Sequence, residues 1–182
     1  MSFEVTPQSI VDVLLIEGSR FGDERGFFTE DYREEDFRKM GIPPFVQMNH
    51  SRSTRGVLRG LHYQLPPAAV GKLVRCIRGR ILDVAVDLRK GSPSFGQHVM
   101  VELDDRSTRF LWVPAGFAHG ILILSEEADV HYKQTGYWSP EHERAIRWSC
   151  PSLDIPWPKD VEILVSPKDQ AAGFLEEAEL FS

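Results

Sequence analysis

After residue 44 the chain consists of short apolar or alternating runs that are separated by Gly, Pro, Ser or Asp. Runs of about four to eight such residues are typical of β-strands. Many short strands with regular turn signals predict an all-β sandwich or barrel, with jelly rolls among the topologies. The runs that we predict as strands are residues 45–51, 57–65, 72–78, 80–88, 99–103, 110–113, 120–124 and 130–137.

The first 44 residues carry weaker strand signals and one helical segment. Residues 34–40 predict a short helix, because Gly41 is a good C-terminal cap and Pro43 and Pro44 prevent continuation. Before it we predict strands at 3–5, 13–16 and 27–32, with turns at Pro7 and at 21–26.

The tail, residues 152–182, is rich in proline and acids, and we expect it to wrap the barrel and to end in a short helix near 174–180. No linker interrupts the chain, so residues 1–182 are predicted to form one domain. The expected architecture is therefore a barrel with a few short helices.

Composition is that of an ordinary soluble globular protein, with 42% hydrophobic and 26% charged residues. No apolar run approaches the ~20 residues of a membrane span, and no secretion signal is visible, so we expect a cytoplasmic protein without a membrane partner. Cys76 and Cys150 match neither a disulfide framework nor a zinc pattern. The net charge of −6 argues against nucleic-acid binding.

Charge is distributed unevenly in this acidic chain, since no Asp or Glu lies between Phe37 and Leu82. A block of one sign predicts a surface for an anion, here a small molecule with phosphate or carboxylate groups. The alternative is a set of scattered surface cations that pair with acids on neighbouring strands. The cations of the block are Arg38, Lys39, Arg52, Arg55, Arg59, Lys72, Arg75, Arg78 and Arg80.

The predicted strand at 57–65 carries Arg59 and His62, which face opposite sides of a regular strand. They share a pocket only if Gly60 marks a bulge or bend, which is a common use of glycine within a strand. On the next strand Lys72 either faces the barrel interior, where it needs a partner or ligand, or lies in solvent at the strand end.

The segment 113–120 has the pattern Pro-x-Gly-x-x-His, which delivers His119 at the start of an apolar strand. This pattern resembles the second conserved segment of the cupin superfamily of jelly-roll barrels. In metal-binding cupins that histidine is one of three or four ligands, and the others come from a His-x-His and a Glu. Here His62 is followed by Tyr63 and Gln64 instead, so a metal site is disfavoured.

A closer resemblance follows from motifs that occur in family order and cover residues ~10 to ~170. The chain resembles the dTDP-4-dehydrorhamnose 3,5-epimerase family. That resemblance implies a cofactor-free, metal-free jelly-roll homodimer that acts on dTDP-4-keto-6-deoxyglucose in dTDP-L-rhamnose synthesis. The motifs are residues 23–30, 55–64, 71–75, 83–87, 92–96, 114–120, 132–133, 157–158 and 166–169.

The resemblance also implies a catalytic set for inverting carbons next to a ketone, which needs a base, a clamp for the enolate oxygen and an acid on the opposite face. His62 resembles the base and Asp169 the carboxylate that pairs with it. Lys72 resembles the residue that stabilises the enolate, and Tyr132 resembles the acid. Without the family, His62 and Tyr132 would be interpreted as structural residues, and Asp169 as a solvated one.

Substrate-binding positions are implied in the same way. Arg59 and His119 resemble contacts to the sugar and diphosphate, and Lys168 resembles a contact to the nucleotide. The remaining positions are Gln47, Asn49, Trp138 and Glu143 near the nucleotide or substrate, and Arg25, Phe28 and Glu30, which in the family reach into the site of the dimer partner.

Two departures from the family pattern are Trp138, where many members have a second tyrosine after Tyr137, and Ile121, where phenylalanine is frequent. An indole at 138 still offers a face for stacking on thymine. Three alternatives stay open: a relative that inverts C3 or C5 alone, a metal-dependent cupin oxygenase or isomerase, and a nucleotide-sugar-binding module without catalysis.

Overall fold

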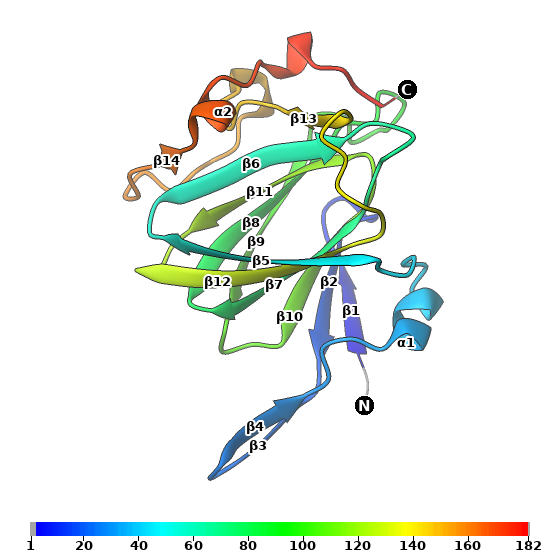
Figure 1. The fold of residues 1–182 in the computed structure, drawn as a ribbon, viewed down its shortest axis with the longest axis vertical. Helices are drawn as coiled ribbons and strands as arrows, with labels where there is room; N and C mark the ends of the chain where they lie inside the picture. The colour runs from blue at the N-terminus through cyan, green and yellow to red at the C-terminus, as the bar shows by residue number, and fades with distance from the viewer. Residues whose placement is uncertain (1–2, 182) are drawn as a thin grey trace.

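A computed structural model describes residues 3–181, and its strands form two facing sheets (Figure 1). The first sheet has the order β1 (Phe3–Pro7), β2 (Leu14–Gly18), β10 (Arg109–Val113), β7 (Lys72–Arg78), β12 (Glu127–Gln134) and β5 (Gln47–Thr54). The second has the order β13 (Glu143–Ala145), β6 (Val57–Gln64), β11 (Phe117–Ile123), β8 (Arg80–Asp87) and β9 (His98–Asp104), and β14 (Leu164–Val165) pairs with β6 in parallel.

Much of the space between the sheets is filled by the inward side chains of both, which alternate along the strands. Val74 and Cys76 of β7 and Ile81 and Ala85 of β8 belong to this core, and so does Ile121 of β11. The fold is an all-β jelly-roll barrel of the cupin type, as predicted. None of the helices within residues 3–181 is long and apolar enough to cross a membrane.

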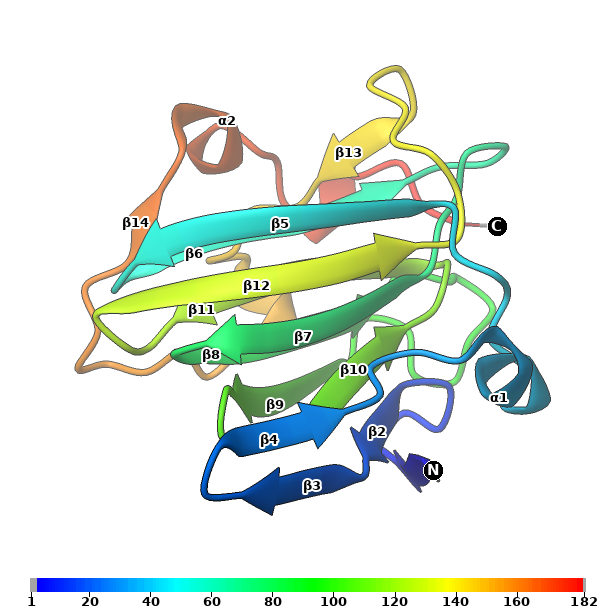
Figure 2. The same cartoon turned by 60° about the horizontal axis from the view of Figure 1, so that its bottom comes forward.

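Short helices lie on the outside of the barrel (Figure 2). The helix α1 (Glu34–Lys39) buries Phe37 against the outer face of the first sheet, and α2 (Pro167–Gln170) lies over β6. Two 3-10 helices span Pro151–Leu153 and Leu175–Glu177.

Several sequence-based boundaries were wrong. The predicted turn at 21–26 and strand at 27–32 are one hairpin, β3 (Arg20–Asp23) and β4 (Gly26–Thr29), which projects from the barrel. The tail contains β14 and α2, which were not predicted, and only the 3-10 turn at Leu175–Glu177 where a helix over 174–180 was expected. Strand β13 was also missed, because a three-residue strand is specified by its pairing with β6 more than by its own pattern.

A bulge in β6 brings Arg59 and His62 to the same side of the strand. Arg59 pairs with Ile121 and His62 with His119, so two residues of β6 face Gly120 alone. The bulge depends on Gly60, whose φ of 132° suits glycine and whose added Cβ would lie 2.6 Å from the Gly120 Cα. The condition under which Arg59 and His62 share a pocket, a bulge or bend at Gly60, is therefore met.

We predict that Gly60→Ala lowers the free energy of unfolding by at least about 2 kcal/mol, because it combines backbone strain with a collision against the backbone of β11. Denaturant unfolding measures this loss. Gly91→Ala is the matched control, since its Cβ meets no atom within 4 Å, and it should change stability by no more than about 0.5 kcal/mol. Equal unfolding midpoints for the two variants would contradict the prediction.

Candidate active site

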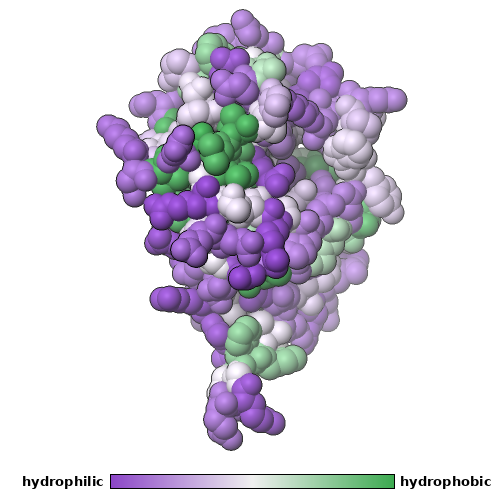
Figure 3. All heavy atoms as spheres, turned by 60° about the vertical axis from the view of Figure 1, so that its left-hand side comes forward, coloured by the Kyte–Doolittle hydropathy of each residue, from purple (hydrophilic) through white to green (hydrophobic). Residues whose placement is uncertain are grey.

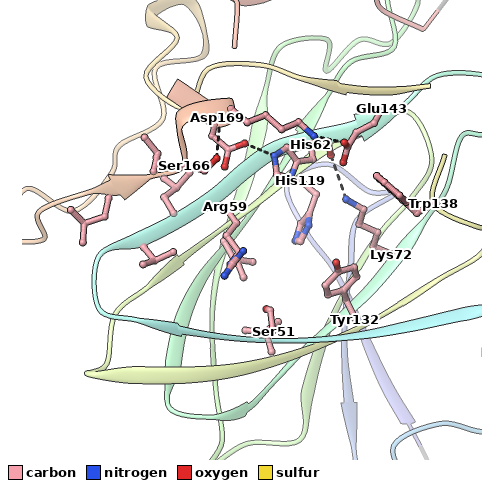
Figure 4. Close-up of a pocket in the computed structure, with 17 residues that line it drawn as sticks. Ser51, Arg59, His62, Lys72, His119, Tyr132, Trp138, Glu143, Ser166 and Asp169 are labelled. Atoms are coloured by element: carbon pink, nitrogen blue, oxygen red, sulfur yellow. Dashed lines mark hydrogen bonds and ion pairs between the residues drawn. The ribbon is translucent and has the colours of Figure 1, made fainter. Parts of the chain in front are cut away.

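The predicted catalytic residues line one cavity of about 610 Å³ between the two sheets, a volume suited to a small-molecule ligand. His62 and Arg59 enter it from β6, His119 from β11, Lys72 from β7 and Tyr132 from β12 (Figure 4). The first two belong with His119 to one sheet, and Lys72 and Tyr132 belong to the other. The cavity therefore has polar groups on both walls.

His62 is paired with Asp169, as the family resemblance implied. The His62 Nε2 lies 2.6 Å from the Asp169 Oδ1, although the residues are 107 positions apart. Burial raises the pKa of Asp169, but hydrogen bonds from His62, from the Ser166 hydroxyl and from the Gly60 N–H lower it more, so the carboxyl stays ionised. An ionised carboxylate only accepts, so Nε2 of His62 carries a hydrogen, and Nδ1 is the ring nitrogen that can act as a base.

Asp169 is held in place by the start of α2. Ser166 is the N-cap, and its hydroxyl accepts a hydrogen bond of 3.1 Å from the Asp169 N–H. Pro167 occupies the first helical position, where a missing N–H costs nothing. Sequence analysis missed this helix, although Ser-Pro-x-Asp is a recognisable N-terminal signal. Asp169 is 4% exposed, so its interpretation as a solvated residue was wrong.

Lys72 faces the cavity and does not lie in solvent. Its Nζ is 3.5 Å from the carbonyl oxygen of His62. Burial lowers the pKa of Lys72 to about 8, and the negative charges of Glu143 and Asp83 oppose that shift. At neutral pH the side chain is therefore an ammonium that is poorly solvated and free to interact with an incoming anion.

Tyr132 lies on the opposite wall from His62 (Figure 4). Burial raises the pKa of Tyr132, with a smaller opposing effect of Arg59, so its hydroxyl is protonated at neutral pH. The cavity thus places the imidazole of His62 and the phenol of Tyr132 on different sheets, with the Lys72 ammonium in the same cavity.

The sequence predicted His119 at the start of an apolar strand. In the structure His119 lies within β11. Its Nε2 is 2.7 Å from the Asp83 Oδ1. Burial lowers the pKa of His119, the carboxylate of Asp83 opposes this, and the charges of Lys72 and His62 lower it further. His119 is accordingly neutral at pH 7, with its hydrogen on Nε2. Asp83 was not predicted as a site residue.

Trp138, Glu143 and Lys168 also line the cavity, and both Trp138 and Lys168 interact with Glu143. Burial raises the pKa of Glu143, but hydrogen bonds from Lys168 and from the Trp138 indole lower it more. The indole remains 54% exposed and available for stacking. The structure therefore brings Trp138, Glu143 and Lys168 together at one cavity.

Gln47 and Asn49 are near this group but do not line the cavity. The Gln47 Nε2 donates to the Asn49 Oδ1 at 3.0 Å, and the Trp138 N–H donates to the Gln47 Oε1 at 2.9 Å. In this structure the two side chains support the segment that carries Trp138.

Arg25, Phe28 and Glu30 are not brought to this cavity. Arg25 and Phe28 lie on the projecting hairpin, and Glu30 follows it and pairs with Arg33 at 2.8 Å. Phe28 is 59% exposed. Within one copy of the chain, these three residues have no contact with the cavity.

The cations of the acid-free block do not form one continuous surface for an anion. Six of its nine cations pair with acids, four of them on other elements, as the alternative interpretation held, and two within α1, while Arg59 and Lys72 line the cavity. Arg59 donates to the Ser53 Oγ at 3.0 Å. The other pairs are Arg38 with Glu34, Lys39 with Glu35, Arg52 with Asp129, Arg75 with Asp31, Arg78 with Glu127 and Arg80 with Glu102.

Groups of three or more His, Cys, Asp or Glu side chains in the arrangement of a metal site do not occur among residues 3–181. The histidines that line the cavity are instead each bound to one carboxylate, which leaves a hydrogen on Nε2. The donor set is therefore suited to proton transfer.

Known proteins are similar to this chain in both sequence and fold. The family model of dTDP-4-dehydrorhamnose 3,5-epimerase matches residues 7–177. A dTDP-4-dehydrorhamnose 3,5-epimerase from Pseudomonas aeruginosa is 51% identical over 180 residues, which is 98% of this chain and 99% of that protein.

Solved structures agree. A dTDP-6-deoxy-D-glucose-3,5-epimerase from Legionella pneumophila in complex with dTDP-4-keto-L-rhamnose has a TM-score of 0.94 and 45% identity, covering 98% of this chain and 95% of that one. A 3′-monoepimerase from Streptomyces bikiniensis in complex with dTDP-quinovose is also similar, with a TM-score of 0.89 and 35% identity over 93% of this chain and 87% of that one. From the family model and the identity over nearly the whole length, we conclude that the chain belongs to the dTDP-4-dehydrorhamnose 3,5-epimerase family.

Proposed function

We propose that this protein converts dTDP-4-dehydro-6-deoxy-D-glucose to dTDP-4-dehydro-L-rhamnose by inverting C3 and C5, within dTDP-L-rhamnose synthesis in the cytoplasm. The observation that carries the proposal is that His62, paired with Asp169, shares one cavity with Lys72 and Tyr132. Inversion at both carbons is favoured because the 3,5-epimerase from Pseudomonas aeruginosa is 51% identical, against 35% for the 3′-monoepimerase.

The proposed reaction begins with His62, whose Nδ1 removes the hydrogen from a carbon next to the ketone. The electron pair of the broken C–H bond moves to the ketone oxygen and forms an enolate. Asp169 stabilises the imidazolium that results, and the Lys72 ammonium stabilises the negative oxygen. No cofactor is needed for this step, since the carbonyl of the substrate itself accepts the electrons.

Tyr132 then returns a proton to the other face of the carbon. Its hydroxyl is suited to this because burial keeps the phenol protonated and because β12 and β6 belong to opposing sheets. Before the second inversion His62 gives its proton to solvent and Tyr132 takes one from solvent, and repetition at the second carbon then gives the doubly inverted sugar. Arg59 and His119 are assigned to the sugar and diphosphate, and Lys168, Glu143 and Trp138 to the nucleotide, with Gln47 and Asn49 beside them.

Arg25, Phe28 and Glu30 are assigned to the neighbouring site of a homodimer. Their hairpin projects from the barrel and carries exposed aromatic side chains, which are visible as the green atoms of the protrusion in Figure 3. Phe21, Phe27 and Phe28 are 54%, 53% and 59% exposed. Exposed aromatic groups of this kind favour burial against another protein surface, and β5 lies at the edge of its sheet, open to pairing.

The function is tested by incubation with dTDP-4-keto-6-deoxyglucose in deuterated water. We expect deuterium at both C3 and C5, because each inversion replaces a carbon-bound hydrogen with one from solvent, and NMR or mass spectrometry measures it. Label at one carbon alone identifies a mono-epimerase, and no label contradicts an epimerase.

In the same assay His62→Asn should abolish exchange while dTDP affinity stays within about threefold. Loss of both exchange and dTDP affinity would mean that His62 is a structural or binding residue.

Lys72→Met is predicted to lower kcat by about 100-fold, which corresponds to about 3 kcal/mol of lost enolate stabilisation. The wild-type kcat should also fall as the pH rises through about 8, where Lys72 loses its proton, and this alkaline decrease should be absent from the residual activity of the variant. Steady-state kinetics between about pH 6 and about pH 9.5 measures both effects. Lys133→Met, on the outer face of the same sheet, is the control; an equal loss in that variant would contradict the role of Lys72.

The shared site is tested by mixing two inactive variants, Arg25→Ala and His62→Asn. If each hairpin completes the partner's site, a mixed dimer has one intact site, and random exchange of subunits restores about a quarter of the wild-type sites. Activity measured before and after exchange detects this recovery. Mixing Lys72→Met with His62→Asn is the control, because both residues then belong to the same copy's wall and the mixed dimer has no intact site. Recovery in neither mixture would contradict a shared site.

A further inference from the structure

The segment between β12 and β13, residues 135–142, carries Trp138 to the cavity and includes no strand or helix. Tyr137 and Trp138 are 71% and 54% exposed, so burial of their side chains does little to fix this segment. A segment with few buried apolar contacts samples many conformations unless hydrogen bonds restrict its main chain. The position of the indole therefore depends on polar contacts.

Gln64, the last residue of β6, supplies those contacts. It is 5% exposed and does not line the cavity. Its Oε1 accepts a hydrogen bond of 2.7 Å from the Ser139 N–H, and its Nε2 donates to the carbonyl oxygen of Tyr137 at 3.2 Å. Nε2 also donates to the carbonyl oxygen of Ala68 at 2.6 Å. One buried side chain thus binds the main chain on both sides of Trp138.

A glutamine suits this position because its amide both donates and accepts. The two groups that flank Trp138 need opposite partners, since Ser139 offers an N–H and Tyr137 offers a carbonyl oxygen. The contact extends to Glu143, whose N–H donates to the Ser139 carbonyl oxygen at 3.0 Å and whose carboxylate is bound by the Trp138 indole. Gln64 is therefore connected to two residues of the cavity wall.

We propose that Gln64 is a positioning residue: without touching the substrate, it fixes the main chain of residues 137–139 so that the Trp138 indole is held at the cavity for the nucleotide base. This role deepens the function proposed above and rests on it, because Trp138 is assigned there to the nucleotide. A ring that is fixed before its ligand arrives loses less conformational entropy on binding. Gln64 therefore contributes to nucleotide affinity and not to proton transfer.

Gln64→Met keeps the approximate size of the side chain and removes its three hydrogen bonds. We expect dTDP affinity, measured by calorimetry, to fall about tenfold and KM to rise by a similar factor, while kcat at saturating substrate stays within about threefold. A dTDP affinity within about twofold of wild type would overturn the proposal, and so would a loss confined to kcat.

The position of the indole is observed by fluorine NMR of protein labelled with fluorotryptophan. The chain has four tryptophans, and the Trp138 resonance is identified by its loss in Trp138→Phe. In Gln64→Met this resonance should shift, while that of Trp112, which is 6% exposed in the outer core of the first sheet, should not. Equal shifts of both resonances would mean general loosening of the fold, and they would overturn the role of Gln64.

Trp138→Ala tests whether Gln64 acts through the indole. Alone, this variant should lower dTDP affinity at least about tenfold, and Gln64→Met added to it should lower the affinity by no more than about twofold further. Losses that multiply in full would overturn the proposal, because Gln64 would then act independently of Trp138.

Tyr63→Phe is the matched control. Tyr63 precedes Gln64 on β6 and is 3% exposed, and its hydroxyl donates to the main-chain carbonyl oxygen of Glu179 at 2.7 Å. The variant loses a buried hydrogen bond to main chain without touching residues 137–139, so dTDP affinity should stay within about twofold and the Trp138 resonance should not move. An equal weakening of dTDP binding here would overturn the proposal, since any defect in β6 would then suffice.

If Gln64→Met does not fold, Gln64→Glu carries the test. The glutamate keeps the shape and the acceptor for the Ser139 N–H but has no donor for the carbonyl oxygens of Tyr137 and Ala68. We expect dTDP affinity to fall at least about threefold and the Trp138 resonance to shift. Wild-type values for both quantities would overturn the proposal.

Neither calorimetry with dTDP nor fluorine NMR requires turnover. A wild-type protein that binds dTDP without deuterium exchange would therefore contradict the proposed epimerase function alone. Deuterium exchange by the wild type, combined with wild-type affinity and spectra in Gln64→Met, would contradict the role of Gln64 alone.

Discussion

The hydrogen bond between His62 and Asp169 connects the tail of the chain to the centre of the barrel, and the candidate site depends on it. Asp169 lies on a four-residue helix, a length that has no stability of its own in water. The helix is fixed by the Ser166 cap and by the pairing of β14 with β6 just before it. The tail therefore determines which nitrogen of His62 carries the hydrogen, because Asp169 binds Nε2.

The barrel solves a problem of geometry for this chemistry. Inversion of a carbon requires that a proton leave one face and arrive at the other, so base and acid must approach the sugar from opposite sides. His62 and Tyr132 belong to different sheets, and the bulge at Gly60 turns Arg59 to the same wall as His62. One sheet alone would present all of these groups to the same face of a ligand. The apolar core fills the rest of the barrel and confines the polar groups to the cavity.

The pattern of the sequence predicted most of the barrel strands, and the family resemblance predicted the candidate catalytic residues and the pairing of His62 with Asp169, but neither predicted the other charge pairs. Strands such as β7 and β8 are fixed by their own apolar content, whereas β13 and β14 exist because β6 offers a free edge. Arg52 pairs with Asp129 and Arg78 pairs with Glu127, and each pair joins two different strands. Cations that form a block in the sequence are therefore paired with acids from other strands in the folded protein. Asp83 looked like one more strand residue, because only the fold reveals that His119 lies against it. Local pattern predicts elements, while charge compensation is a property of their assembly.

The charged groups of the cavity lie where charge of the opposite sign develops in the proposed reaction. Transfer of a proton from carbon to His62 creates a cation on the imidazole and an anion on the substrate oxygen at the same moment. The imidazolium forms against the ionised Asp169, and the enolate forms near the Lys72 ammonium, so each new charge meets a group that already has the opposite sign. Because Asp169 is buried, Lys72 is half-buried and both are in place before the substrate arrives, little reorganisation is required during the reaction. A lysine suits the second position better than an arginine, since a compact ammonium on a flexible stem can follow the oxygen as the first and then the second carbon is inverted.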